Sequence, residues 1–434
     1  MRPLRSALLA ATVATALTGA LAVGVLPAAA TTNANTNTNA NATPPAAFEL
    51  VGSGWGHGVG LSQYGAQAMA REGRSTAQIL AHYYRGTTLG RNPSGRALDV
   101  NVRYQPTSFS LSHRALAAGS QLTVCAMQGT RCARSRSVID RTADAATVGR
   151  VVLSRTANGV RATVTNAKGR THQLEAPRIR VRWTGTRLKK GAASVIRLDT
   201  GREYRHGQLM VTPYGNASLN ANLRVRLQGE YLRGVAEMPS SWEPAALQAQ
   251  AIIARTYALR GAATRKSDCG CHMRDSVVNQ VYAGWSKESE GTNASFGKRW
   301  VAAVTATKGQ VVQYGGGLAE TYYYSSSGGS TLNSEDVWSA TVPYLRATTD
   351  PWSTTAANPN RRWTHRISQA SASQLFGLAK VLRIEITGRH QGGGIAELTA
   401  YGPKNTKRIS GKADTLRIRL GLKSAWVNDI TAVR

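Results

Sequence analysis

The sequence predicts an α+β protein in which a β-rich inserted or accessory region accompanies a mixed domain of helices and strands. Short runs that alternate apolar and polar residues fill residues 97–211, a pattern typical of strands buried on one face. Apolar or small residues recur at helical spacing in residues 66–84 and 244–263. The 434 residues suffice for a large core and more than one domain, and no internal repeat divides them.

The N-terminus has the pattern of an export signal. Arg2 and Arg5 precede an uncharged apolar run over residues 7–26, and three alanines at 28–30 supply a small-residue cleavage site. We predict a signal peptide at residues 1–30, with an uncleaved membrane anchor as the alternative because the run is long. The Thr-, Asn- and Ala-rich stretch 31–47 is expected to be a flexible linker.

The charge balance indicates an anionic partner. The chain holds 54 Lys and Arg against 23 Asp and Glu, a formal net charge of +31. Because 42% of the residues are hydrophobic and only 18% are charged, a wholly disordered basic chain is excluded. For a secreted, wall-associated protein the charge favours anionic wall polymers as partners, and we expect no nucleic acid partner.

Residues 48–94 are expected to form one segment of the mixed domain. They begin with the glycine-rich run GSGWGHGVGLSQYG, followed by helices over 66–72 and 75–84, the second capped by Ser75. Glycine at this density indicates close approach of the backbone to another group, and the spacing does not fit a phosphate-binding loop.

Residues 95–200 are expected to form the β-rich accessory region, whose outward strand positions are rich in arginine. Strands are predicted at 98–104, 121–125, 150–155, 160–166, 179–183 and 194–198. Cys125 and Cys132 flank a glycine-containing turn, which predicts a disulfide across a hairpin.

Residues 201–434 are expected to form the main region of the mixed domain. A strand pair at 204–215 and 219–228 leads to a long helix from about 244 to 263, with Ser240 or Ser241 as its N-cap and Glu243 in its first turn. Further on, the pattern predicts a helix at 301–309 and strands at 310–315 and 320–326. The last seventy residues predict a helix at 372–381, strands at 383–389 and 395–401, and then a strand and a short C-terminal helix.

Cys269 and Cys271 form the second close pair of cysteines. An exported chain with an even cysteine count favours a local disulfide. With His272 the pair could instead bind a metal, but zinc takes four ligands and this segment offers three at most. We therefore expect a disulfide here, no metal site and no cofactor.

Glu237 is the residue best placed for acid–base chemistry. It lies in the irregular stretch VAEMP between two helices, beside apolar residues and Trp242. Apolar surroundings disfavour an ionised carboxylate, which is how a general acid for neutral pH is made. A helix-capping or salt-bridged role is the structural alternative. The run of tyrosines, serines and glycines at 322–329 suits a polar ligand with apolar sugar faces, or simply a strand and turn.

Several longer blocks resemble the SpoIID/LytB family, named for the stage II sporulation protein D. The blocks are GWGHGVGLSQYGAQAMAREGRSTAQILAHYYRGT, LQGEYLRGVAEMPSSWEPAALQAQAIIARTYAL, DSVVNQVYAGW, YYYSSSGGST and VPYLRATTDPW. They cover most of residues 202–434 together with residues 48–89, and leave the β-rich region outside or at the margin.

The resemblance implies a secreted lytic transglycosylase that cleaves the glycan strands of peptidoglycan. It implies that Glu237 is the catalytic acid/base. Positions that line the family's cleft correspond here to His57, Gln63, Tyr64, Arg255, Tyr257, Tyr324, Ser325 and Ser327. One carboxyl group suffices for this reaction because the sugar's own 6-hydroxyl is the nucleophile, so the absence of a paired-carboxylate motif does not exclude it. The alternative is a non-catalytic wall-binding protein that positions or stimulates another autolysin.

The order of the blocks departs from the family pattern. The GHGVGLSQYGA block ordinarily lies near the C-terminus, and here it comes first, so the order resembles a circular permutation. A permutation is tolerated where the chain ends meet in space. It predicts that Phe48 lies beside the end of the chain.

Overall fold

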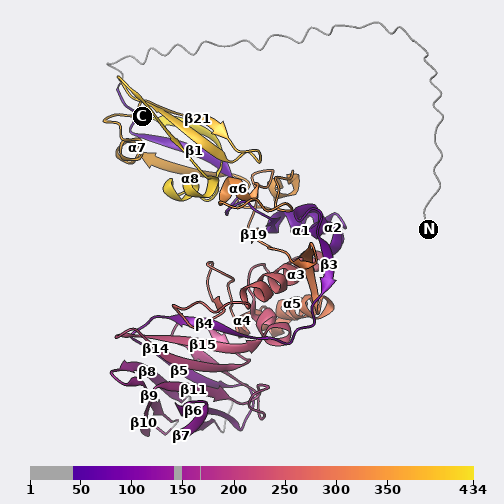
Figure 1. Ribbon diagram of the computed structural model, residues 1–434, viewed down its shortest axis with the longest axis vertical. Helices are drawn as coiled ribbons and strands as arrows, with labels where there is room; N and C mark the ends of the chain where they lie inside the picture. The colour runs from indigo at the N-terminus through magenta and orange to yellow at the C-terminus, as the bar shows by residue number, and fades with distance from the viewer. Residues whose placement is uncertain (1–42, 141–148, 167) are drawn as a thin grey trace, which may run out of the picture.

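The structure, a computed structural model, describes residues 43–140, 149–166 and 168–434. The predicted signal peptide and residues 31–42 of the predicted linker lie outside these residues. The described chain is elongated and stacks a β-sandwich, a helical layer and a second β-containing part along its long axis (Figure 1). Within the described residues, no helix has the length and apolar character needed to cross a membrane.

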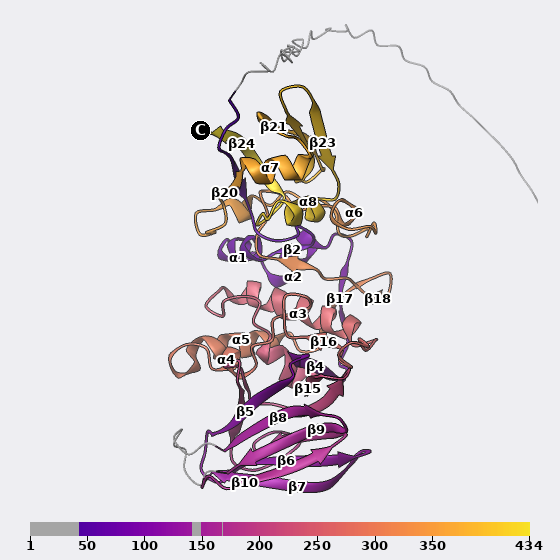
Figure 2. The same cartoon turned by 90° about the vertical axis from the view of Figure 1, so that its left-hand side faces the viewer.

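The β-sandwich consists of two sheets packed face to face, and β9 contacts β11 and β14 across the interface (Figure 2). The six-stranded sheet has the order β10 (Thr171–Ala176), β9 (Gly159–Thr165), β8 (Arg150–Thr156), β5 (Ser108–Ala115), β12 (Ser194–Leu198) and β13 (Glu203–Tyr204). The seven-stranded sheet has the order β16 (Met273–Arg274), β4 (Ala97–Tyr104), β15 (Ser218–Arg226), β14 (Gln208–Tyr214), β11 (Arg178–Trp183), β6 (Ser120–Gln128) and β7 (Arg131–Asp140). Alternate residues of β11, such as Ile179 and Val181, are fully buried between the sheets.

The alternating runs of the sequence predicted six of these strands, and the structure adds β5, β7, β10 and the two-residue strands β13 and β16. The two cysteines at 125 and 132 are joined by a disulfide that links β6 to β7. The strand pair predicted at 204–215 and 219–228 is the antiparallel hairpin β14–β15, and it lies in the same sheet as β4 and β11. The sheet therefore continues across residue 200, where the sequence places a boundary.

The helical layer is built around α3 (Pro244–Gly261), which has buried residues on every side. Around it lie α1 (Gln63–Arg71), α2 (Thr76–Tyr83), α4 (Trp285–Glu288), α5 (Ser295–Ala306), the short helical turns η2 (Leu227–Tyr231), η3 (Leu232–Gly234) and η4 (Thr292–Ala294), and the small sheet β18 (Gly317–Leu318), β17 (Gln310–Tyr314) and β3 (Thr88–Arg91).

One of the two predicted helix caps is confirmed and the other is wrong. Ser75 caps α2 in a capping box with Gln78, as predicted. The predicted cap of α3 is wrong, because its N-cap residue is Glu243 and Pro244 begins the helix. Ser240 is unavailable for capping since its hydroxyl donates a 2.6 Å hydrogen bond to Glu290.

The third part joins the two ends of the described chain. It contains the sheet β20 (Trp363–Ser368), β1 (Ala47–Ser53) and β24 (Trp426–Val433), the sheet β21 (Arg383–Arg389), β22 (Ile395–Tyr401) and β23 (Thr406–Ser410), and the helical segments α6 (Ser334–Val337), η5 (Pro351–Thr354), α7 (Gln369–Phe376) and α8 (Ala413–Arg419). Phe48 pairs with Ala432, which confirms that it lies beside the end of the chain. The sequence analysis did not predict β24, whose one partner in the sheet, β1, lies hundreds of residues earlier in the chain.

The glycine-rich segment carries the chain from β1 into the helical layer. Its strand β2 (Leu61–Ser62) pairs in parallel with β19 (Tyr323–Tyr324). Gly60 has φ +79°, and a Cβ there would lie 2.1 Å from the carbonyl oxygen of Tyr322. The glycines are needed because the backbones approach closely here.

Candidate active site

A cleft of about 440 Å³ lies where the glycine-rich segment meets the helical layer. Six separate stretches of chain supply its walls. Its lining residues are Trp55, Gly56, His57, Gln63, Glu237, Tyr257, Val277, Val278, Asn279, Tyr322, Tyr323, Tyr324, Ser325 and Trp338. Among the predicted site residues, the cleft therefore brings together His57, Gln63, Glu237, Tyr257, Tyr324 and Ser325.

Glu237 occupies the turn between η3 and α3 and is half-buried. Its Oε1 accepts a 2.6 Å hydrogen bond from the backbone N–H of Val281. The Tyr323 hydroxyl also hydrogen-bonds to the carboxyl group. These contacts hold the carboxyl group in place, and the residue also lines the cleft.

Burial raises the pKa of Glu237 above its ordinary value, and the negative charge of Asp275 adds to the increase. The hydrogen bonds from Val281 and Tyr323 favour the ionised form and oppose this shift. The net effect keeps the carboxyl group protonated to a higher pH than an exposed glutamate. A carboxyl group in this environment can both donate and accept a proton.

Glu237 is the only carboxylate among the described residues that line this cleft. Asp275, whose charge acts on Glu237, does not line the cleft and is hydrogen-bonded to other residues. Its Oδ1 accepts a 2.7 Å hydrogen bond from the N–H of Tyr282, and its Oδ2 lies 3.3 Å from the hydroxyl of Tyr204. The cleft therefore offers one acid/base group and no carboxylate partner for it.

Gln63, the first residue of α1, holds the turn that carries Glu237. Its Nε2 donates a 2.9 Å hydrogen bond to the backbone carbonyl of Glu237 and a 3.3 Å one to Oε1 of Gln250 on α3. Ser62 fixes the start of α1 as N-cap by accepting a hydrogen bond from the N–H of Gly65. The glycine-rich segment thus contributes directly to the geometry of the turn.

His57 lines the cleft as a neutral ring. Its Nδ1 accepts a hydrogen bond from the N–H of Val59, so Nε2 carries the proton and donates it to the carbonyl of Tyr323. Burial lowers the pKa of His57 to about 4. Both nitrogens are engaged, so the ring can contribute a surface to the cleft but no proton near neutral pH.

Aromatic rings form the remaining walls. The ring of Trp338 lies 5.0 Å from that of His57 and 4.6 Å from that of Tyr322, measured between centroids. Trp55 stands at the rim with 51% of its surface exposed. Flat apolar rings beside hydroxyl groups are suited to sugar rings, which have apolar faces and polar edges. Sequence reasoning did not identify Trp55, Trp338 or the loop 277–279, because their roles depend on tertiary contacts.

Three predicted site residues do not line the cleft. Arg255 is fully buried and holds α3 against α5 and β17: its guanidinium donates to Oε1 of Gln228 at 2.8 Å and to the backbone carbonyls of Gln310 and Val304. Ser327 is also fully buried and donates a 2.7 Å hydrogen bond to Asp350. Tyr64 packs against Trp242 instead, with 4.9 Å between ring centroids.

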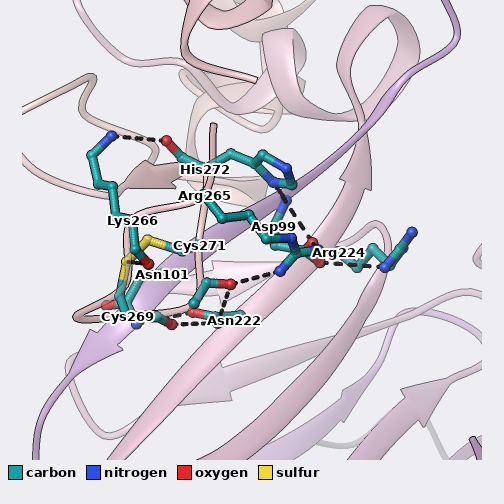
Figure 3. A network of polar contacts seen from close by, with 10 residues as sticks. Asp99, Asn101, Asn222, Arg224, Arg265, Lys266, Cys269, Cys271 and His272 are labelled. Carbon is teal, nitrogen blue, oxygen red and sulfur yellow. Dashed lines mark hydrogen bonds and ion pairs between the residues drawn. A yellow bond between two sulfur atoms is a disulfide. The ribbon is translucent and has the colours of Figure 1, made fainter. Parts of the chain in front are cut away.

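The cysteines at 269 and 271 are joined by a disulfide in the loop that leads to residues 277–279 (Figure 3). The bond removes both thiolates as metal ligands. Nδ1 of His272 accepts a 3.0 Å hydrogen bond from the N–H of Asp99. In the part of the chain that the structure describes, no three His, Cys, Asp or Glu residues are grouped to hold a metal ion.

The fold and cleft define an α+β protein with one buried carboxyl group in an aromatic cleft. Residues 217–314 match the family described as SpoIID, stage II sporulation protein. This match over part of the chain agrees with the resemblance of its motifs to the SpoIID family.

The chain is also similar to named proteins of bacilli. It is 39% identical over 140 residues to the amidase enhancer of Bacillus subtilis (strain 168), 32% of this chain and 17% of that protein. It is 29% identical over 204 residues to the stage II sporulation protein D of the same strain, and 30% over 208 residues to that of Bacillus amyloliquefaciens. The last two matches each cover 45% of this chain and 58% of the relative's length.

Proposed function

We propose that the protein is a peptidoglycan lytic transglycosylase with Glu237 as its single general acid/base. The observation that carries the proposal is that Glu237 is the one carboxylate among the described residues lining an aromatic cleft, and that burial raises its pKa. A hydrolytic glycosidase uses two carboxylates, whereas a reaction in which the substrate supplies its own nucleophile needs one.

The proposed reaction proceeds in two proton transfers. The protonated carboxyl of Glu237 gives its proton to the glycosidic oxygen as the bond from that oxygen to the anomeric carbon breaks. The carboxylate that remains then removes the proton of the 6-hydroxyl of the same sugar. The 6-oxygen attacks the anomeric carbon and closes a 1,6-anhydro ring. Glu237 regains its proton, and no water is consumed.

The other residues of the cleft have supporting roles in this proposal. Tyr257, Tyr322, Tyr324 and Trp338 offer surfaces for sugar rings, and Ser325 and Asn279 offer hydrogen-bonding groups. Gln63 fixes the turn through the carbonyl of Glu237. His57 contributes the face of a neutral ring.

A second candidate is a non-catalytic wall-binding protein that positions or stimulates another wall-degrading enzyme. The similarity to a protein named amidase enhancer favours it, as that name describes an assisting role. In this alternative the cleft binds a glycan strand without cutting it.

Digestion of purified glycan strands, followed by mass spectrometry of the products, separates the two candidates. The transglycosylase is expected to yield 1,6-anhydro-muramyl ends that are lost in Glu237→Gln, which keeps the Val281 hydrogen bond. Anhydro ends that persist in Glu237→Gln overturn the assignment of Glu237, and the absence of any cleavage by the native protein favours the binding role.

A further inference from the structure

A second hollow of about 270 Å³ adjoins the cleft. Tyr257, Asn279 and Tyr322 line both hollows and so form their common wall. The remaining lining residues of the second hollow are Arg260, Gly261, Lys266, Met273 and Glu320. A glycan that lies in the cleft could therefore extend a substituent into this space.

One basic side chain of the second hollow has no acidic partner among the described residues. Arg260 forms a 2.7 Å ion pair with Glu320, and the Tyr322 hydroxyl also hydrogen-bonds to that carboxylate. The ammonium group of Lys266 donates to the backbone carbonyl of His272 at 3.1 Å and, among the described residues, forms no ion pair. The hollow thus has a net charge of +1 that is localised on Lys266.

Lys266 is held in place by the disulfide loop (Figure 3). Its N–H donates to the carbonyl of Cys271 at 2.8 Å, and its carbonyl accepts from the N–H of Gly270 at 2.8 Å. The disulfide between Cys269 and Cys271 closes this turn. A lysine whose backbone is fixed on both sides loses less freedom when it binds a ligand.

The basic residues near Lys266 already have acidic partners. Arg265 pairs with Asp99, and Arg274 pairs with Asp268. Because Lys266 is half-buried, its attraction to an opposite charge is screened less than on an open surface.

We propose that the second hollow is a subsite for a carboxylate carried by a sugar of the glycan, with Lys266 as the group that binds it. This inference rests on the proposed function, because it places a glycan in the cleft. Two sources share this chemistry. One is the free acid of the lactyl ether on a muramic acid residue, and the other is a carboxylate of a peptide attached to that ether.

Binding measurements in the Glu237→Gln background test the subsite without turnover. Isothermal titration calorimetry compares three glycans of equal length: one with free lactyl acids, one bearing peptides, and a chito-oligosaccharide, which has neither. Lys266→Gln is expected to weaken binding of at least one acidic glycan about 10-fold and to change chito-oligosaccharide binding less than about 2-fold. Lys266→Arg, which keeps the charge, is expected to retain most of the affinity.

Lys404→Gln is the matched control, because Lys404 is exposed in the turn after β22, away from both hollows. A loss confined to the free-acid glycan identifies the lactyl acid, and a loss confined to the peptide-bearing glycan identifies the peptide; both support the subsite. Equal effects on all three glycans, or no effect on any, overturn it. If the Glu237→Gln protein with Lys266 intact binds none of the three glycans, the proposed function itself fails.

Discussion

The side-chain amide of Gln63 donates a 2.9 Å hydrogen bond to the backbone carbonyl of Glu237, 174 residues further along the chain. The contact joins the N-terminal glycine-rich segment to the turn that carries the candidate acid. The same amide reaches Oε1 of Gln250 on α3. The candidate active site is therefore complete only when the first and middle parts of the chain pack together.

Replacing Gln63 tests whether this contact positions Glu237. Gln63→Ala is expected to lower kcat for glycan cleavage about 10-fold and to change KM little, because a displaced general acid slows the chemical step more than binding. Steady-state kinetics on soluble glycan strands measure both constants. Gln173→Ala, at an exposed position of β10, is the control. An unchanged kcat in Gln63→Ala would show that the contact has no part in catalysis.

The pH dependence of cleavage follows from the raised pKa of Glu237. The reaction needs the protonated carboxyl, so kcat/KM is expected to fall as pH rises through that pKa, which lies above the ordinary value of about 4.3. A pH–rate profile on soluble glycan locates this alkaline limb. A limb at the ordinary glutamate pKa would contradict the role of burial.

The raised pKa of Glu237 should also make the free energy of unfolding depend on pH. Between the unfolded and the raised folded pKa of Glu237, the folded state binds more protons, so this group's contribution to stability falls as pH rises. Glu237→Gln is therefore expected to increase the free energy of unfolding at pH 7. The increase should vanish at a pH below both pKa values, where both states are protonated. Urea denaturation at the two pH values measures it, and an equal effect at both would contradict the linkage.

Arg255 is expected to contribute to stability and to leave the chemistry unaffected. Arg255→Met removes the guanidinium that donates to the carbonyls of Gln310 and Val304, which should cost about 3 kcal/mol of unfolding free energy. Activity per folded molecule is expected to stay near the native level. Arg74→Met, at an exposed position, should change stability by less than about 0.5 kcal/mol. Lost activity with unchanged stability would show that Arg255 acts in substrate binding or catalysis and not in stability.

An arginine ladder, defined as Arg178, Arg180 and Arg182 on β11, offers a cationic surface for anionic wall polymers. Its members alternate with buried residues, so they share the outer face of the strand, and none forms an ion pair among the described residues. Replacing all three by Gln is expected to weaken binding to purified walls several-fold at low salt, about 50 mM, and far less at high salt, where charges are screened.

The control for the ladder changes the same total charge. It replaces three arginines that the structure pairs with glutamates, namely Arg114, Arg161 and Arg346. Wall pull-down at the two salt concentrations compares the variants. Equal loss in the two triple variants would show that net charge, and not the ladder, determines wall binding.

Local patterns predicted much of the fold, because strand alternation and a capping box depend only on residues that are close in sequence. The runs that became β11 and β12 and the start of α2 at Ser75 are examples. Arg255 could not be placed this way. Since α3 is buried all round, its sequence does not reveal which side faces the cleft. The failed cap at Ser240 has the same kind of cause, a distant partner in Glu290.

The candidate site was predictable where one motif carried it and not where several segments meet. Glu237 and its apolar neighbours lie within a few residues, and its raised pKa agrees with that reading. Trp338 lines the cleft and contacts Tyr322 and also His57, which is remote from it in sequence. The motif that contains Ser327 gave no sign that its hydroxyl is bound to Asp350.

Digestion of glycan strands in 18O-labelled water tests the central claim most directly. If the 6-hydroxyl of the substrate closes the ring, the products of the native protein contain no 18O at the new end, and Glu237→Gln forms no such product. Incorporation of one 18O at each new reducing end would show that water is the nucleophile, and would contradict the single-carboxyl transglycosylase proposed for Glu237.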